Sequence, residues 1–141
     1  MYCAGIISII CLLFSGPQEK TILDIEINPI RNTKGVILIS VYTTENQYPY
    51  HPAKTYEVKK DSLTNGTIHT SINDLSPGRY GLCFLDDENR SGGMDNNLIG
   101  IPKEGFGFAN NVKPFLKHPD YDQILFDLHP GKNHIQLIVR Y

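Results

Sequence analysis

The residues best suited to chemistry lie in one polar stretch, residues 86–111 (DDENRSGGMDNNLIGIPKEGFGFANN). Oxygen-bearing side chains occupy alternate positions at Asp87, Asn89 and Ser91, a glycine follows, and Asp95 comes next. EF-hand-type calcium loops carry oxygen ligands at positions 1, 3, 5 and 9 and a glycine at position 6. The spacing therefore predicts a Ca²⁺ site built on these four side chains.

The match to a calcium loop is incomplete. The carbonyl of Gly93 is expected at position 7, but Leu98 stands at position 12, where such loops carry a bidentate glutamate. Asp86 or Glu104 could fold in to replace that ligand. A plain turn is the alternative, because Asp and Asn side chains in such sequences also bond their own backbone. If the loop binds an ion, we expect the affinity of extracellular modules, a Kd of about 10⁻⁴ to 10⁻³ M.

The second half of the stretch alternates glycine with phenylalanine over residues 105–108. Glycines let the backbone pass close to a neighbour, and the aromatic rings can cover the domain. A structural plug is the favoured interpretation. The alternative is a groove for a ligand or peptide, with Lys103 and Glu104 at its rim. The candidate binding residues here, besides the ion ligands, are Asp86, Lys103, Phe106 and Phe108.

The segments on either side of this stretch are predicted to be β-strands that position it. Apolar and polar residues alternate, or apolar runs stand between turn residues such as Asn65-Gly66 and Pro77-Gly78. The predicted strands are 21–28, 36–42, 55–59, 67–73, 80–85, 121–128 and 135–141. No window has a convincing helical period. The sequence thus predicts an all-β fold, a single immunoglobulin- or transthyretin-like β-sandwich of about seven strands with one long glycine-rich loop.

The N-terminus points to export. Residues 5–14 (GIISIICLLF) form an uncharged apolar run that is too short to span a membrane and about right for a signal-peptide core. A buried first strand is the alternative. We expect a signal peptide over residues 1–16 and a β-sandwich domain over 17–141, with no transmembrane segment in the mature chain. The protein would then be periplasmic, surface-exposed or secreted, with Cys83 as its single, inert cysteine.

Composition excludes several classes of function. The chain of 141 residues is 40% hydrophobic and 20% charged with a net charge of -2, so it is globular and lacks the basic surface of a nucleic-acid binder. No Ser-His-Asp, Cys-His or histidine-cluster spacing promises a catalytic centre. Tyr48, Tyr50 and His51 could line a pocket, but we expect them to cover the edge of the sandwich.

Several motifs together resemble a known family. They are Leu-x-Pro-Gly-x-Tyr over 75–80, Asp-Glu-Asn over 87–89, Asp-x-Asn over 95–97 and Gly-Ile-Pro-Lys-Glu-Gly-Phe-Gly-Phe over 100–108. Their order is similar to the domain of unknown function 2141 family of exported bacterial proteins, across most of the chain after the signal. Members often have histidine at Asp86 and asparagine at Ser91, which changes the charge and ligands of the site. The Leu-x-Pro-Gly-x-Tyr turn also resembles transthyretin-like and carboxypeptidase-regulatory-like sandwiches.

Three functions are compatible with these features. The first is an exported noncatalytic module, stabilised by an ion, that binds an envelope partner or a carbohydrate. The second is a metal-dependent or carboxylate-based hydrolase using Asp86, Asp87 and Glu104, helped by His51 or His118. The third is a structural envelope protein or a small-ligand carrier. The absence of a catalytic pattern favours the first.

Overall fold

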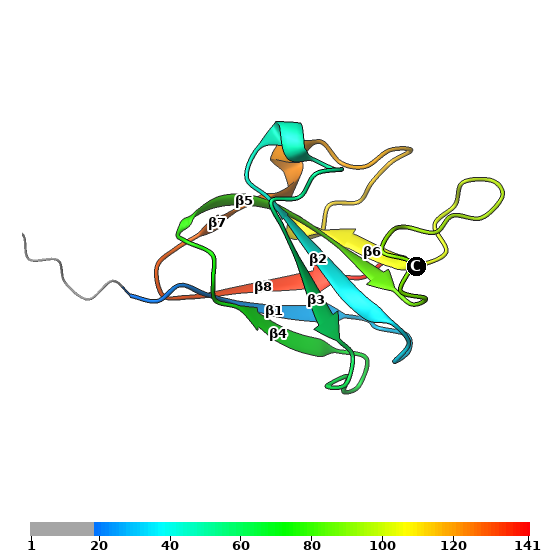
Figure 1. Cartoon of the computed structure of the whole chain (residues 1–141), viewed down its shortest axis with the longest axis horizontal. Coiled ribbons are helices and arrows are strands. Elements are labelled where there is room, and N and C mark those ends of the chain that lie inside the picture. The colour runs from blue at the N-terminus through cyan, green and yellow to red at the C-terminus, as the bar shows by residue number, and fades with distance from the viewer. Residues whose placement is uncertain (1–18) are drawn as a thin grey trace, which may run out of the picture.

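The computed structural model describes residues 19–141, so the predicted signal peptide lies outside the described residues. Over that range eight strands form two sheets that pack face to face, and the fold is all-β (Figure 1). The strands are β1 (Ile22–Asn28), β2 (Val36–Tyr42), β3 (Lys54–Lys59), β4 (Ile68–Ile72), β5 (Gly78–Asp87), β6 (Gly105–Phe108), β7 (Leu125–Leu128) and β8 (Lys132–Ile138). No helix among these residues is long and apolar enough to cross a membrane.

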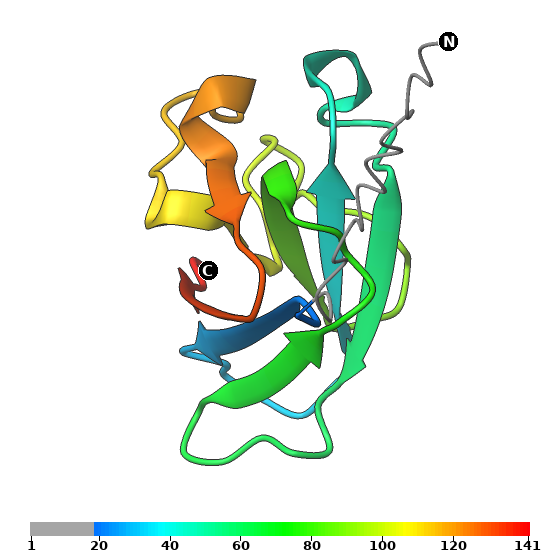
Figure 2. The same ribbon diagram turned by 90° about the vertical axis from the view of Figure 1, so that its left-hand side faces the viewer.

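The two sheets differ in size and connection. The smaller has the order β4-β1-β8, in which β1 pairs antiparallel with β4 and parallel with β8. The larger has the order β3-β2-β5-β6. Strand β5 is long enough to take two partners, β7 along Gly78–Gly81 and β6 along Cys83–Asp86 (Figure 2). The larger sheet therefore carries the long loop between β5 and β6.

The core lies between the sheets and follows from the alternation in the sequence. Leu23, Ile25 and Ile27 of β1 are fully buried, and Ile37 and Ile39 of β2 face them from the larger sheet. Each such side chain contributes about 1.5–3 kcal/mol of transfer free energy. The period-2 pattern of residues 21–28 thus predicts the buried face correctly.

Three short 3-10 helices complete the fold: η1 (Glu45–Gln47), η2 (Ala109–Asn111) and η3 (Tyr121–Ile124). The prediction of one strand over 121–128 is wrong in its first half, where η3 stands. The side-chain oxygen of Gln123 accepts a hydrogen bond from the backbone amide of Asp120, and the backbone amide of Gln123 donates to the Asp120 carbonyl. These two bonds close a local turn in place of a strand. The last strand also begins and ends three residues earlier than predicted.

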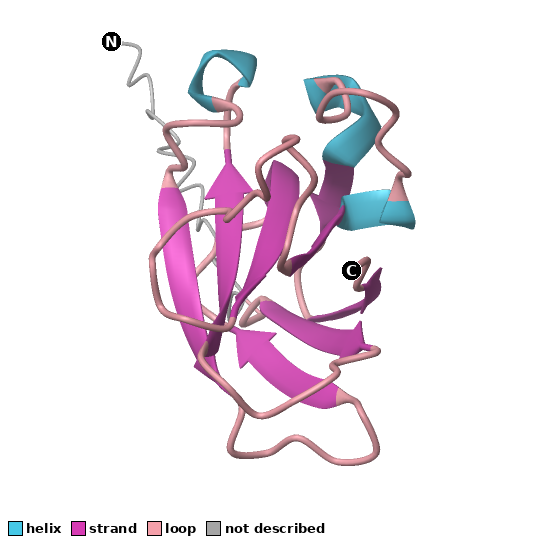
Figure 3. Cartoon of the chain, turned by 90° about the vertical axis from the view of Figure 1, so that its right-hand side faces the viewer, coloured by secondary structure: helices cyan, strands magenta, loops and turns pink. Residues whose placement is uncertain are grey.

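The polar stretch is shorter as a loop than the sequence indicates. Its first two residues end β5, and residues 105–108 form β6, so the irregular part spans 88–104 (Figure 3). Strand β6 escaped prediction because glycine is rare in strands. A Cβ at Gly107 would lie 2.5 Å from the ring of Phe84 and 2.7 Å from the carbonyl oxygen of Ile138. Glycine is therefore required by packing, not by a loop conformation.

Candidate functional site

The predicted ion ligands remain together on one turn. Both carboxylate oxygens of Asp87 accept backbone hydrogen bonds, Oδ1 from the Ser91 amide at 2.9 Å and Oδ2 from the Gly92 amide at 2.8 Å. The Asn89 carboxamide donates to the Asp95 carboxylate at 2.5 Å. The chain thus folds back so that Asp95 meets the start of the turn.

These contacts have the form of the plain turn that was the alternative to an ion site. The Ser91 hydroxyl donates to the Gly93 carbonyl at 2.9 Å, and the Ser91 amide also donates to Asn89. Within residues 19–141, no three His, Cys, Asp or Glu side chains stand close enough to hold a metal. The turn does gather carboxylate, carboxamide, hydroxyl and carbonyl oxygens, which are the donors that Ca²⁺ accepts. Calcium binding by this turn stays a prediction.

Glu104 joins the two halves of the loop. Its side chain is buried, and its carboxylate accepts hydrogen bonds from the Glu88 amide at 3.0 Å and the Asp95 amide at 3.4 Å. It therefore ties the end of β5 to the turn through backbone groups. Because it is buried in this way, Glu104 does not form the rim of a groove.

An ion pair that sequence reasoning missed holds the loop from outside. Arg31 donates through Nε to Glu88 at 2.6 Å and through Nη2 to the carbonyl of Lys103 at 3.0 Å. The hydrogen bond from Arg31 lowers the pKa of Glu88 below its ordinary value of 4.5. Lys103 itself is exposed. Nothing in the local sequence pairs Arg31 with Glu88, because the two residues stand in different strand connections.

Asp86 faces the interior, although the sequence places it beside the ion ligands. Successive residues of β5 alternate between the two faces of the sheet, so Asp86 lies on the core side and is fully buried. It forms an ion pair with Lys60 and accepts a hydrogen bond from the Tyr141 hydroxyl at 2.6 Å. It is therefore closed to any ligand that approaches from the surface.

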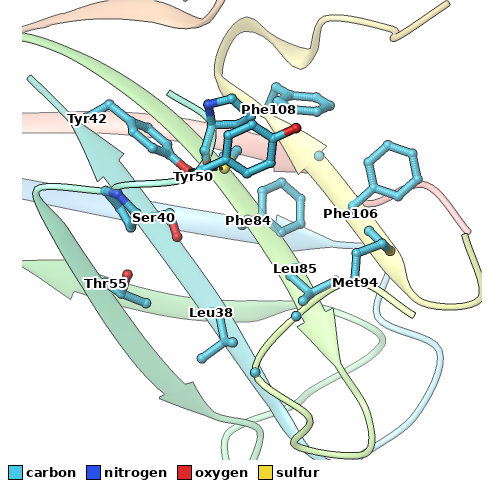
Figure 4. Close-up of a pocket in the computed structure, with 16 residues that line it drawn as sticks. Leu38, Ser40, Tyr42, Tyr50, Thr55, Phe84, Leu85, Met94, Phe106 and Phe108 are labelled. Carbon is cyan, nitrogen blue, oxygen red and sulfur yellow. Dashed lines mark hydrogen bonds between the residues drawn. The ribbon is translucent and has the colours of Figure 1, made fainter. Parts of the chain in front are cut away.

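The outer face of the larger sheet carries two adjoining hollows. In β6 the glycines face inward, and Phe106 and Phe108 face outward (Figure 4). One hollow, of about 480 Å³, lies over β2 and β5, and the other, of about 720 Å³, lies beside the segment 114–118. Tyr50, Met94, Phe106 and Phe108 line both. We name this continuous surface the outer groove.

The outer groove is mainly apolar. Its floor includes Phe108, which is only 8% exposed, whereas Tyr50 is 79% and Leu116 96% exposed at its sides. The charged or titratable side chains among its lining residues are those of Tyr42, Tyr50, Cys83, Lys117 and His118, and none is a carboxylate. Burial raises the pKa of Cys83, so its thiol stays protonated, as expected of an inert cysteine.

The loop before β3 contributes to the outer groove through Tyr50, which was the alternative to the expected cover over the edge of the sandwich. Tyr50 projects over the sheet and lines both hollows, whereas Tyr48 packs into a small aromatic cluster. The rings of Tyr48 and His118 meet edge to face with centroids 5.2 Å apart. Phe106 and Phe108 therefore combine the two predicted roles, since they pack against this cluster and also line the groove.

Comparison with known proteins gives a family and no relative of established activity. Residues 25–136 match the family described as an uncharacterized protein conserved in bacteria (DUF2141). No curated protein and no solved structure matches the chain. The matched range includes the whole loop between β5 and β6 together with the sandwich that carries it. On this match, which confirms the resemblance seen in the sequence, the chain belongs to the DUF2141 family.

Proposed function

We propose that this protein is an exported, noncatalytic β-sandwich module of the transthyretin-like type that binds an apolar segment of a protein partner at the cell envelope. The outer groove is the observation that carries this proposal. Contiguous apolar surface of this kind on a small domain marks an interaction site, and its volume is in the range of ligand sites.

The chemistry of the lining favours peptide side chains as the ligand. Aliphatic, aromatic and proline side chains supply most of the groove. Its polar groups are those of Ser40, Thr55, Asn96, Lys117 and His118 and the hydroxyls of Tyr42 and Tyr50. Apolar side chains of a partner gain free energy by leaving water here without needing many hydrogen bonds. A carbohydrate could stack on Tyr50, but its hydroxyl groups need more directional partners. Carbohydrate is therefore the second candidate, and a small apolar ligand would use the same groove.

The polar turn has a supporting role in this proposal. Gly92, Gly93 and Met94 lie within the turn, between Ser91 and Asp95, and form one wall of the groove. Calcium bound by Asp87, Asn89, Ser91 and Asp95 would hold that wall in place. An ion that binds only the folded state would stabilise the whole domain by mass action.

A capture experiment tests the groove. Immobilised protein is offered a phage-displayed random peptide library and, separately, soluble cell-wall oligosaccharides. We expect enrichment of peptides that contain leucine, isoleucine or aromatic residues. Met94→Asp, which places a charge on the shared wall, should weaken the selected peptides by about tenfold or more, or at least 1.4 kcal/mol.

Leu98→Asp is the matched control, because Leu98 is exposed in the same loop but does not line the groove. It should leave the affinity unchanged. Equal effects of the two substitutions would contradict binding in the groove. Enrichment of oligosaccharides alone would reassign the groove to carbohydrate.

A further inference from the structure

The interior of the sandwich contains an ion pair that the proposed binding function does not use. The side chains of Lys60 and Asp86 contact one another and are 1% and 0% exposed. Lys60 directly follows the edge strand β3, and Asp86 lies in β5, with β2 between these strands. Ile37 of β2 is the direct neighbour of Asp86 in the sheet, so the pair stands against the apolar core.

This pair lacks the support that a buried salt bridge needs. Apart from each other, neither Lys60 Nζ nor Asp86 Oδ1 has a hydrogen-bond partner among the described residues, although Nζ can donate three hydrogen bonds. Two buried charges offset their lost hydration only when further hydrogen bonds satisfy them. Transfer of one proton within the pair removes both charges and leaves an amine facing a carboxylic acid. The amine is then a nucleophile in contact with a carboxyl group.

The other carboxyl oxygen of Asp86 is held by a fixed donor. The Tyr141 hydroxyl donates to Oδ2 at 2.6 Å and itself accepts the Arg31 amide at 3.1 Å. Burial and the hydrogen bond to Asp86 raise the pKa of Tyr141, so the phenol keeps its proton. A donor at this place stabilises the negative charge that develops on Oδ2 when the carbon is attacked.

Glycine at position 105 makes room for this donor. A Cβ on Gly105, which pairs with Asp86 in the sheet, would lie 2.5 Å from the Tyr141 ring. The Arg31 guanidinium stands 4.2 Å over the same ring and fixes its other side. Nucleophile, acceptor and donor are thus positioned from three separate segments of the chain.

We propose that Lys60 and Asp86 condense to an intramolecular isopeptide bond between Nζ and Cγ. The ammonium gives one proton to Oδ1, the amine attacks Cγ, and the carbonyl electron pair moves onto Oδ2 beside Tyr141. Nζ then loses a second proton to Oδ1, the Cγ–Oδ1 bond breaks, and Oδ1 leaves as water. The amide keeps one N–H, and both charges disappear, so no oxidant, reductant or other reactant is needed.

The contact between the two side chains and the exclusion of water from the core favour amide formation. Groups held in contact react as though present at about 10⁵–10⁸ M, and the core around the pair excludes the water needed for hydrolysis. The bond would connect the end of β3 to β5 across β2 and so hold the larger sheet together.

Mass spectrometry of the full chain under denaturing conditions tests the proposal. We expect a mass lower by one water molecule than the mass calculated from the sequence. The N-terminal peptide identifies the first residue of the chain, so that any N-terminal cleavage is included in the calculated mass. Trypsin does not cut after an acylated lysine. It should therefore release one branched peptide that joins residues 60–79 to residues 80–90. The full mass, with separate linear peptides 61–79 and 80–90, would overturn the proposal.

Substitutions at these residues distinguish an isopeptide bond from an ordinary ion pair. Asp86→Asn should still cross-link but lose ammonia in place of water. Lys60→Arg should keep its full mass, and the control Lys59→Arg, an exposed neighbour, should cross-link as the wild type does. Tyr141→Phe should slow the appearance of the branched peptide by about 10²-fold. Branched peptide in Lys60→Arg, or an unchanged rate in Tyr141→Phe, would contradict the assignment of these residues.

Discussion

Removing the carboxylate of Glu104 should loosen the loop between β5 and β6 and destabilise the domain. Glu104→Ala leaves the Glu88 and Asp95 amides without their acceptor. An unsatisfied buried group costs about 1–3 kcal/mol. The contact to Asp95 is the longer one, at 3.4 Å, and contributes less. We therefore expect a loss of about 2–4 kcal/mol in the free energy of unfolding.

Urea denaturation followed by circular dichroism measures this loss, and the slope with denaturant should stay unchanged. At about 4 °C per kcal/mol, the thermal midpoint should fall by roughly 8–16 °C. Glu104→Gln keeps one acceptor oxygen and should cost about 1 kcal/mol. Lys103→Ala is the control, because its side chain is exposed and only its backbone amide and carbonyl form hydrogen bonds, with Asp95 and Arg31. If Glu104→Ala were no more destabilising than Lys103→Ala, the role given to Glu104 would be wrong.

Three further predictions follow from the contacts of the loop and of β6. Gly107→Ala forces a Cβ against Phe84 and should cost about 1–3 kcal/mol in urea denaturation, whereas alanine at Gly93, where nothing lies within 4 Å, should cost little. Calcium at millimolar concentration should raise the thermal midpoint of the wild type but not of Asp87→Ala. If calcium raised the midpoint of neither protein, the segment would be a plain turn that binds no calcium. Because the Glu88 pKa is lowered in the folded state, its contribution to stability is present above pH 4.5 and lost as the pH falls through the lower folded value. Glu88→Gln should therefore lose less stability than the wild type between about pH 5 and pH 3, as measured by urea denaturation at each pH.

The alternation of apolar and polar residues, together with short apolar runs, accounts for most of the strands that could be predicted. The alternation in residues 21–28 and the apolar run 36–42 identify β1 and β2 almost to the residue. The family motif is likewise visible in the sequence. Strand β6 was missed because residues distant in the chain leave no room for a Cβ at its glycines: Phe84 and Ile138 at Gly107, and Val139 and Tyr141 at Gly105. Strand propensity depends only on residue type, and the low propensity of glycine therefore assigned this segment to a loop.

The sequence by itself determined the β class, the buried faces of the strands and the residues of the polar turn, because each depends on neighbours within a few positions. Only the tertiary structure decided which groups the side chains of the polar stretch contact. Asp86 and Asp87 are adjacent in sequence, yet one meets Lys60 and Tyr141 in the core and the other closes the turn with backbone amides. The outer groove likewise requires Tyr50, Met94 and Phe106 to come together from separate segments. Such contacts are set by how the sheets pack and which strands pair, and local periodicity carries no information about either.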